Sequence, residues 1–360
     1  MKSKYKVILD EIVTKVENAT YRPGDMIPTE HDFAALYNVS RTTVQRALNI
    51  LVSKGVIYRI AGKGTFVSDS QLPGQAAHSN GDKTFSLLLP NHSQESIQYA
   101  RGAQAYLERM SYRLSTHFIE KHYENAISEV SALLDGGCPG IILYPASSED
   151  RDGYFRQLAL RDTPIVTIDK EISGSLLSSV ASNNYMGAYS LAEYLISNGH
   201  TDFIYISNGR LNASTLADRY RGFTDCLRDK GIALGEDNVM TNIPYPDNEA
   251  VDVFKKYFAK HPRKTPFVAF CAHDRIASNV YHAAYELNLR IPETMSVVGF
   301  DNLEIAAMLC PSLTTVAQPF FEIGRNAAKI LVRLHEKRDN TTQHMKLSTP
   351  LIIRNSVTVI

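Results

Sequence analysis

The chain has 360 residues, and 38 basic side chains balance 38 acidic ones, so its formal net charge is zero. This length exceeds what one core of ordinary size can organise and favours two or three domains. No run approaches the roughly 18 uninterrupted apolar residues of a membrane helix, and the first residues lack the apolar segment of a signal peptide, so we expect a cytoplasmic protein with no membrane partner.

The four cysteines are far apart in the sequence and form no Cys-x-x-Cys pair. This spacing argues against a disulfide framework and against a zinc site, so we expect small buried core residues. We accordingly expect neither a metal nor another cofactor. The cysteines are Cys138, Cys226, Cys271 and Cys310.

A small charge asymmetry separates the beginning of the chain from the rest. Residues 1–70 hold ten Lys or Arg against seven Asp or Glu, whereas the remainder holds 28 against 31. Such an excess is more often ordinary solvated surface than a nucleic-acid footprint, so the asymmetry alone decides nothing.

The beginning of the chain predicts three helices followed by a hairpin. Apolar residues recur at helical spacing over residues 4–16, and a second helix begins near Thr29, with Asp32 three residues later as in a capping box. Ser40 is the candidate N-cap of a third helix, whose apolar residues stand at i, i+3, i+4 and i+7. The β-rich runs "VIYRI" and "TFV" flank "AGKG", which predicts a hairpin with Lys63 at its basic tip.

Residues 69–83 lack periodicity and are rich in Ser, Gly, Asn, Gln and Asp, which indicates a linker. Beyond it, short and nearly continuous apolar runs alternate with helix-length amphipathic segments, as in parallel sheets whose crossover helices cover both faces. We therefore predict an α+β domain over residues 1–68 and two doubly wound α/β subdomains over 84–360, with a final strand in 351–360. The apolar runs are "FSLLLP", "GIILYP", "PIVTID", "DFIYIS", "PFVAFCA" and "SVVGFDN".

The third helix has a polar face that suits the major groove of DNA, which is wide enough to admit a helix. Arg can contact guanine through two hydrogen bonds, Gln and Asn can contact adenine, and Thr suits phosphate. The same pattern is typical of a solvated helix face with an ordinary cap, so both interpretations stay open. The polar side chains are Arg41 in the first turn and then Thr42, Gln45, Arg46 and Asn49.

The stretch "YRPGDMIPTEHDFAALYNVSRTTVQRALNILVSKGVIYRIAGKGTFV" resembles the winged helix-turn-helix of GntR-type bacterial repressors. It contains a pGd-x-lPtE segment, then VSR-x-TV-x-x-Al, then a G-x-GtfV wing. The resemblance implies a double-stranded DNA partner, with Lys63 and Gly64 on a minor-groove wing. His31 stands where the family usually has Arg, at a position that carries a phosphate or base contact. The other implied DNA contacts are Arg41, Thr42, Thr43 and either Gln45 or Arg46.

Polar residues follow three of the predicted strands in the long region. Ligands of open α/β sheets bind at the carboxyl ends of the strands, where carboxylates can accept the hydroxyls of a polyhydroxy ligand. Each residue alone is more often the cap of the next helix, but together they favour a site. They are Asp169 with Lys170, His273 with Asp274, and Asp301 with Asn302.

The long region resembles the effector domain of lactose-repressor-type regulators, itself similar to periplasmic sugar-binding proteins. The segments that carry this resemblance include "PIVTIDK", "DRYRGF", "SVVGFDN" and "PSLTTVAQPFFEIGRNAA". The resemblance implies that Arg219 and Asp301 hold the hydroxyls of a ligand and that Asp169 and Gln318 line the site.

Two further candidates concern the identity of the ligand. His273-Asp274 stands where that family commonly has Asn-Asp, so the departure bears on which sugar is bound. Tyr144, after "GIIL", is a candidate aromatic partner for a sugar face, although a core or surface role is the commoner one for a tyrosine.

The two resemblances together predict a ligand-responsive regulator and no catalytic residues. The pairing of domains resembles the arabinose repressors, which implies a monosaccharide such as L-arabinose as effector. Two heads reading two half-sites imply a homodimer and a near-palindromic operator. A sugar- or nucleotide-processing enzyme on the same fold is the alternative, but the chain has no P-loop, G-x-S-x-G or H-E-x-x-H motif. A transport binding protein would need a signal peptide.

Overall fold

The computed structural model consists of two compact units, residues 1–82 and 83–360. Of the predicted linker, Lys83 alone lies within the described residues. Among the described helices, none has the length and apolar character needed to cross a membrane. The described residues are 4–18, 20–22, 24–37, 39–53, 56–60, 64–67, 83–119, 123–150, 153–209, 211, 214–244, 248–263, 266–336 and 341–360.

The first unit contains the three predicted helices and a small antiparallel sheet of order β1-β3-β2. The hairpin strands β2 and β3 were expected, whereas the short strand β1 was not, because two residues carry no periodicity. Met26 of β1 pairs with Phe66 of β3. The elements are α1 (Lys4–Glu17), β1 (Met26–Ile27), α2 (Glu30–Tyr37), α3 (Arg41–Ser53), β2 (Ile57–Ile60) and β3 (Gly64–Val67).

Local capping fixes where the helices of this unit begin. The Thr43 backbone N–H donates to the Ser40 Oγ over 3.3 Å at the start of α3. At the start of α2, the Thr29 N–H donates to the Asp32 carboxylate over 2.9 Å, which closes the expected capping box. The core of the unit is the apolar side of α3 packed on α1 and α2. It contains Ile8, Ile12, Phe33, Val44, Ala47, Leu48 and Leu51, all buried.

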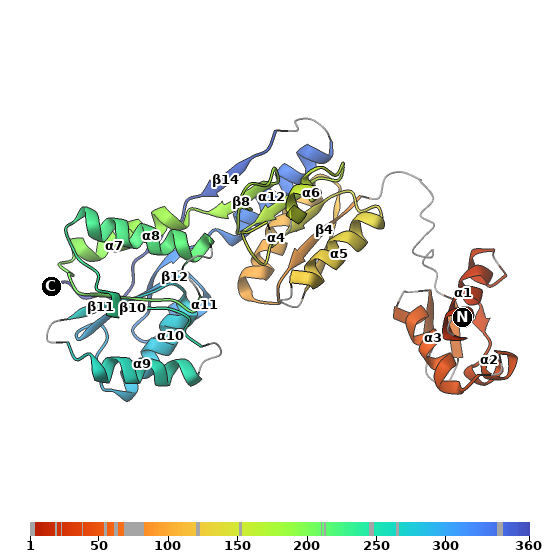
Figure 1. Ribbon diagram of the computed structural model, residues 1–360, viewed down its shortest axis with the longest axis horizontal. Coiled ribbons are helices and arrows are strands. Elements are labelled where there is room, and N and C mark those ends of the chain that lie inside the picture. Colours follow the sequence, from red (N-terminus) through yellow and green to blue (C-terminus); the bar gives the residue numbers. More distant parts are fainter. Residues whose placement is uncertain are drawn as a thin grey trace. The chain divides into compact units, whose positions relative to one another are not determined.

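The second unit contains two six-stranded sheets, as the alternation of apolar runs and helices predicts (Figure 1). We call the part around the sheet of order β14-β8-β7-β6-β4-β5 the N-lobe, and the part around β10-β9-β11-β12-β13-β15 the C-lobe. The N-lobe strands are β4 (Thr84–Leu89), β5 (Arg113–Phe118), β6 (Ile141–Leu143), β7 (Ile165–Ile168), β8 (Ser178–Ser182) and β14 (His344–Leu347). The C-lobe strands are β9 (Phe203–Ile206), β10 (Val239–Met240), β11 (Phe267–Cys271), β12 (Met295–Asp301), β13 (Thr314–Ala317) and β15 (Leu351–Ile352).

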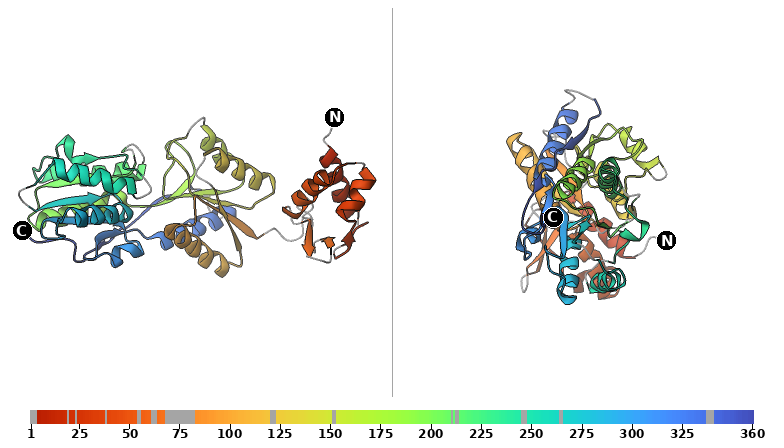
Figure 2. Two further views of the ribbon diagram at one scale, coloured as in Figure 1. Left: turned by 90° about the horizontal axis from the view of Figure 1, so that it is seen from below. Right: turned by 90° about the vertical axis from the view of Figure 1, so that its left-hand side faces the viewer.

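Helices cover both faces of each sheet in this unit (Figure 2). In the C-lobe, α7 and α8 pack on one face, and α9 and α10 pack on the other. In the N-lobe, α4 and α12 cover one face, whereas α5 and α6 cover the other. The helices are α4 (Gln94–Arg109), α5 (Tyr123–Asp135), α6 (Tyr154–Ala159), α7 (Asn184–Ser197), α8 (Ser214–Asp229), α9 (Asn248–Lys260), α10 (Asp274–Glu286), α11 (Glu304–Met308) and α12 (Phe320–His335).

The chain passes between the two lobes three times within this unit. It leaves the N-lobe sheet after β8, returns from β13 into α12, and leaves again between β14 and β15. Every described strand pair in the two sheets is parallel except β13 with β15, which is antiparallel. Because three segments join the lobes, a relative movement of the lobes is confined to bending at these crossings.

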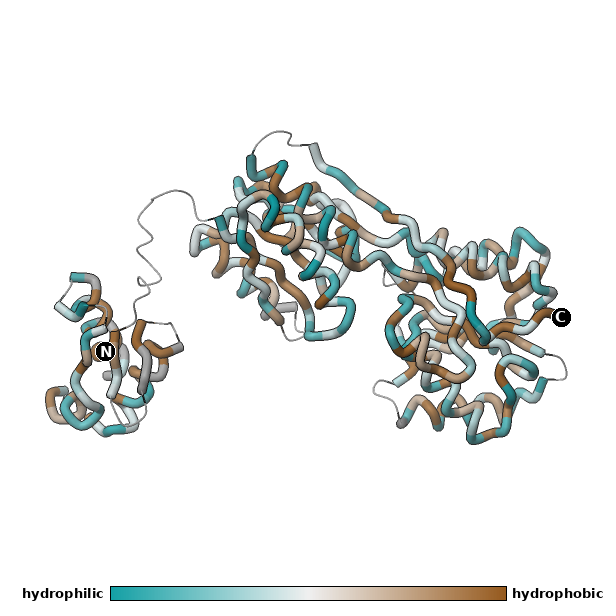
Figure 3. The backbone as a smooth tube through the Cα atoms, turned by 180° about the vertical axis from the view of Figure 1, so that it is seen from behind, coloured by the Kyte–Doolittle hydropathy of each residue, from teal (hydrophilic) through white to brown (hydrophobic). Residues whose placement is uncertain are grey.

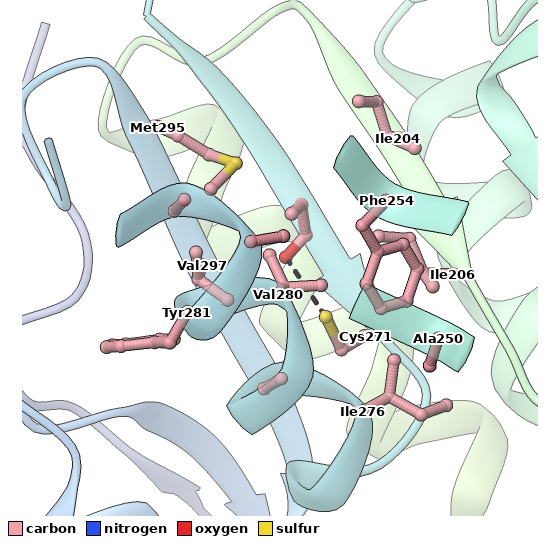
Figure 4. Close-up of a cluster of buried hydrophobic side chains, with 14 of the residues drawn as sticks. Ile204, Ile206, Ala250, Phe254, Cys271, Ile276, Val280, Tyr281, Met295 and Val297 are labelled. Atoms are coloured by element: carbon pink, nitrogen blue, oxygen red, sulfur yellow. Dashed lines mark hydrogen bonds between the residues drawn. The ribbon is translucent and has the colours of Figure 1, made fainter. Parts of the chain in front are cut away.

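Buried apolar strands form the centre of each lobe, as the hydropathy along the backbone shows (Figure 3). In the C-lobe, Cys271 of β11 lies in a cluster with Phe254, Ile276 and Val280 (Figure 4). Cys226 is also buried, which agrees with the expected core role, and Cys138 is partly buried. Cys310 is exposed, so the expectation of burial is wrong for that residue.

Two strands and one chain end differ from the sequence-based prediction. Strand β5, RLSTHF, is mostly polar and lies at the sheet edge, and β8 consists largely of small polar residues, so neither has the continuous apolar run that identified the others. The final strand contains only Leu351 and Ile352. Residues 353–360 instead follow the C-lobe as an extended tail, in which the Ser356 carbonyl accepts from the Val297 N–H.

Candidate functional site

A polar cavity of about 380 Å³ lies between the two lobes of the second unit. Six of the seven predicted ligand residues line it, and the seventh, Asp274, does not. Pockets for small molecules occupy about 300–1,000 Å³, so this cavity suits a small one. Its lining is Asn91, Ser93, Glu95, Tyr99, Tyr144, Asp169, Asn208, Thr215, Arg219, His273, Arg275, Ile276, Asp301, Gln318 and Phe320.

Arg219 of α8 is the buried cation of the C-lobe wall. Its Nε donates to the Asn184 Oδ1 over 2.8 Å, and its Nη1 donates to the Ala272 carbonyl. The guanidinium carbon lies 3.9 Å from the centroid of the Phe300 ring. These contacts fix the plane of the guanidinium, so Arg219 presents hydrogen-bond donors to the cavity in one orientation.

Asp301, the last residue of β12, is the carboxylate opposite that cation. Its Oδ1 lies 3.3 Å from the Arg219 Nη1 and accepts from the Gln318 Nε2 over 2.6 Å. Burial alone would raise the pKa of the Asp301 carboxyl, but the Arg219 charge and hydrogen bonds from His273 and Gln318 hold the pKa below its usual range. Asp301 therefore stays a carboxylate and can accept hydroxyl hydrogens.

His273 completes the polar wall of the C-lobe. Its Nδ1 lies 3.3 Å from the Arg219 Nη1 and 3.3 Å from the Asp301 Oδ2, and its side chain is 27% exposed. The imidazole thus lies beside Arg219 and Asp301, at the position where the resembled family commonly has an asparagine amide.

Asp274 is placed behind the cavity wall, contrary to its assignment as a ligand residue. It is completely buried at the start of α10, where its Oδ2 accepts from the Leu303 N–H over 2.7 Å and its Oδ1 accepts from the Thr315 hydroxyl over 2.6 Å. These two hydrogen bonds join the start of α10 to β13 and to the segment that follows β12. Burial, and then the nearby Asp301 charge, raise the pKa of Asp274.

The N-lobe wall combines aromatic rings with a carboxylate. Tyr99 and Phe320 pack edge to face with centroids 5.4 Å apart, and Tyr144 lies 6.2 Å from Tyr99. The Tyr99 hydroxyl donates to the Asp169 Oδ1 over 3.4 Å, and Lys170 lies 3.2 Å from the Asp169 Oδ2. A ligand in the cavity therefore meets apolar ring surface on one side and hydrogen-bonding groups on the other.

Two charged lining residues were not found from the sequence. Glu95 of α4 and Arg275 of α10 form a two-fold hydrogen-bonded ion pair across the cavity, with distances of 2.9 and 3.0 Å. Neither follows a strand or belongs to a quoted motif, so no local signal identified them. A sequence signal did exist for Phe320, because it lies two residues after the predicted lining residue Gln318 in "QPFFEIG".

The exposed face of α3 in the first unit carries the predicted DNA contacts. Thr43 is partly buried and bonded to Ser40, and Gly64 begins β3 with a φ of +130°. L side chains rarely adopt this positive φ, which explains why glycine suits the position; a Cβ there would also lie 3.0 Å from the Met26 Sδ. The exposed candidates are Arg41, Thr42, Gln45 and Arg46 on α3 and His31 on α2, and Lys63 lies outside the described residues.

Arg46 of α3 also contacts a helix of its own domain. Its guanidinium lies 4.7 Å from the centroid of the Tyr5 ring of α1. This cation–π contact orients the side chain and joins α3 to α1.

Among the described residues of both units, no group of three or more His, Cys, Asp or Glu side chains is placed so that it could hold a metal ion.

Two known families match separate parts of the chain. Residues 4–67 match the family described as bacterial regulatory proteins, gntR family. Residues 192–357 match the periplasmic binding protein-like domain.

Relatives of known name match almost the whole chain. An arabinose metabolism transcriptional repressor from Halalkalibacterium halodurans is 26% identical, covering 99% of this chain and 97% of that protein. One of the same name from Geobacillus stearothermophilus is 26% identical over 98% and 97%. A ribose operon repressor from Halalkalibacterium halodurans is 28% identical over 91% and 96%.

Solved structures share the fold of the second unit. A LacI-type putative transcriptional regulator from Bacillus cereus subsp. cytotoxis superposes with a TM-score of 0.67 at 24% identity, covering 77% of this chain and 99% of that one. A putative ribose operon repressor from Burkholderia thailandensis has a TM-score of 0.66 at 24% identity, covering 75% and 99%.

Proposed function

We propose that this chain, which joins a GntR-type DNA-binding domain to a periplasmic-binding-protein-like effector domain, is a transcriptional repressor whose operator affinity changes when a small carbohydrate binds between the two lobes. The named relatives are all transcriptional repressors, so the enzyme alternative is set aside.

The single observation that carries the proposal is the cavity wall formed by Arg219, Asp301 and Gln318. Arg219 and Asp301 are buried and Gln318 is partly buried; the three side chains are held by one another and by the backbone, and they offer both donors and acceptors to a ligand. Gln318 also lines the cavity, and its buried Oε1 has no hydrogen-bond partner among the described residues. Leaving such an acceptor unpaired is costly, so a small rearrangement of this side chain that pairs it with a ligand hydroxyl is favoured.

A carbohydrate fits the asymmetry of the cavity. Ring C–H groups of a sugar pack on aromatic side chains such as Tyr99 and Phe320, while its hydroxyls pair with the carboxylates and Arg219. A monosaccharide matches the small volume. We take L-arabinose as the first candidate because two close matches are named arabinose repressors, and D-ribose as the second because another is a ribose operon repressor.

Ligand binding can change DNA affinity because the cavity is shared by both lobes. A ligand that contacts both walls favours the closed arrangement, and it shifts the equilibrium by the difference between its affinities for the two arrangements. In a homodimer, the spacing of two DNA-binding heads then differs between ligand-free and ligand-bound states, and a near-palindromic operator reports that difference.

DNA is read through α3 in this proposal. Arg41, Gln45 and Arg46 approach base edges, and Thr42 and Thr43 contact phosphate near the helix start. His31, Lys63 and Gly64 add contacts from α2 and the wing.

The proposal is tested by two measurements on the full chain. Calorimetric titration with L-arabinose, D-ribose, D-xylose, D-galactose and D-glucose should yield one clear binder. Selection of bound sequences from random double-stranded DNA should enrich a near-palindrome, and the sugar that binds should change affinity for it. Binding of no sugar by folded protein would refute the effector assignment, and enrichment of no sequence would refute the repressor.

A further inference from the structure

The charged side chains at the cavity are arranged in pairs of opposite sign. Arg219 lies 3.3 Å from Asp301 at the C-lobe wall, and Lys170, which does not itself line the cavity, lies 3.2 Å from Asp169 of the N-lobe wall. The third pair, Glu95 with Arg275, joins the two lobes. With His273 neutral, the formal charges of these six side chains sum to zero. The cavity therefore holds no cation without a carboxylate partner among them.

The pair of Glu95 and Arg275 has the geometry of a strong charge-assisted contact. The Arg275 Nη1 donates to the Glu95 Oε1 over 2.9 Å, and its Nη2 donates to the Glu95 Oε2 over 3.0 Å. Both terminal nitrogens are thus engaged by one carboxylate. The side chains are 24% and 36% exposed, and both line the cavity, so a ligand reaches them.

We propose that Glu95 determines the ligand class by neutralising Arg275, which restricts the cavity to uncharged polyhydroxy ligands and excludes phosphorylated or carboxylated sugars. This inference rests on the proposed carbohydrate effector and specifies its chemistry. Arg275 is the cation that an incoming phosphate would reach, and Glu95 both occupies its donors and repels the phosphate.

The physical basis is the desolvation penalty of an anion that enters the cavity without gaining an unneutralised cation as its partner. A phosphate brought into the cavity loses water, and it recovers that loss only by pairing with a cation. Arg219 is fixed by Asn184 and a backbone carbonyl and is balanced by Asp301, so a phosphate that approached its remaining donors would also meet the Asp301 carboxylate, which lies 3.3 Å from the Arg219 Nη1. His273 has its Nδ1 directed at the same two charges. Uncharged hydroxyls incur much smaller costs and use the acceptors already present.

The test compares wild type with Glu95→Gln in the full-length protein. Gln has nearly the shape of Glu but no charge, so it releases Arg275 for a phosphate. Calorimetry is performed with L-arabinose and L-arabinose 5-phosphate, D-ribose and D-ribose 5-phosphate, and D-glucose and D-glucose 6-phosphate. The readout is the ratio of phosphate-ester affinity to free-sugar affinity. Loss of the ion pair between Glu95 and Arg275 also removes a contact between the lobes, but this change affects both ligands equally and cancels in the ratio.

We expect wild type to bind a free sugar much more tightly than its phosphate ester, and Glu95→Gln to raise the ratio of phosphate-ester affinity to free-sugar affinity by about 10- to 150-fold, the value of one charge-assisted hydrogen bond of about 1.5–3 kcal/mol. The double variant Glu95→Gln/Arg275→Gln lacks the released cation and should lose that gain. Thermal melting of each variant establishes that it is folded.

Three results would overturn the inference while leaving the carbohydrate effector intact. They are tight binding of a phosphate ester by wild type, an unchanged ratio in Glu95→Gln, and an equal gain in the double variant. Loss of every ligand by folded Glu95→Gln would show that the pair acts only as a bridge between the lobes and would also overturn it. Binding of no free sugar by wild type would refute the proposed function and this inference with it.

Discussion

The Arg219 Nη1 and the Asp301 Oδ1 lie 3.3 Å apart, although one residue belongs to α8 and the other ends β12. Both side chains are buried, so each is the other's main compensation for lost hydration. The pair is at once part of the fold of the C-lobe and the polar centre of the cavity. Substitutions here should therefore change both stability and ligand response.

Asp301→Asn should abolish the response to sugar while the ligand-free protein still binds its operator. The amide cannot balance the buried Arg219 charge, so we also expect a loss of about 3 kcal/mol in the free energy of unfolding. Ligand titration and chemical denaturation measure the two effects. Asp252→Asn, at an exposed carboxylate paired with Lys255 on α9, is the control and should retain both properties. A sugar response that survives in Asp301→Asn would contradict the assigned cavity.

The Asp274 carboxyl should make the second unit less stable as pH rises. Burial and then the Asp301 charge raise its pKa from 3.8 to about 8 in the folded protein. Between these values the folded state holds a proton that the unfolded state has released, so the free energy of unfolding falls as pH increases from about 4 to about 8.

Asp274→Asn should remove most of this pH dependence, because the amide keeps a neutral group of the same shape between Leu303 and Thr315. Denaturant unfolding at several pH values measures the slope. An unchanged slope in Asp274→Asn would mean that Asp274 ionises normally in the folded protein.

Gly102→Ala should weaken both the fold of the N-lobe and ligand binding. A Cβ at Gly102 of α4 would collide with the Phe321 carbonyl of α12, and one at Gly324 would collide with the Tyr99 carbonyl, so the two helices cross at backbone contact. Separating them costs about 1–3 kcal/mol of stability and displaces Tyr99, which forms part of the cavity wall.

Thermal unfolding and ligand titration test the effect of Gly102→Ala. Gly235→Ala is the matched control, because Gly235 has a φ of −67° and no atom within contact distance of a new Cβ except the Asn238 Nδ2 at 4.0 Å. Equal behaviour of the two variants would contradict the close crossing of α4 and α12.

Arg41→Ala should reduce operator affinity by about 1–3 kcal/mol if Arg41 reads a guanine. The side chain is exposed at the start of α3, so the stability of the first unit should not change. Fluorescence anisotropy with the selected operator measures the affinity. Arg109→Ala removes an exposed charge from α4 of the second unit and should have little effect. Unchanged affinity would remove Arg41 from the contact set.

Arrangements that depend on neighbours in the sequence were predictable from the sequence. Ser40 caps α3 through a residue three positions away, and the apolar stripe of that helix follows from the 3.6-residue period. The buried strands were recognised because both of their faces are covered, which demands continuous apolar residues. The carboxyl ends of such strands meet at one edge of a sheet, which is why Asp169 and Asp301 could be placed at a site.

Only the tertiary structure decided what depends on distant partners. Asp274 and His273 are adjacent in the sequence, yet one is buried behind the wall and the other lines the cavity, because α10 begins between them. Strand β8 is buried by helices elsewhere in the chain, despite its small polar residues. Glu95 and Arg275 are 180 positions apart, and their contact exists only because two lobes face each other. The sequence by itself determined the elements and the strand ends that carry chemistry, whereas long-range packing determined which charges meet.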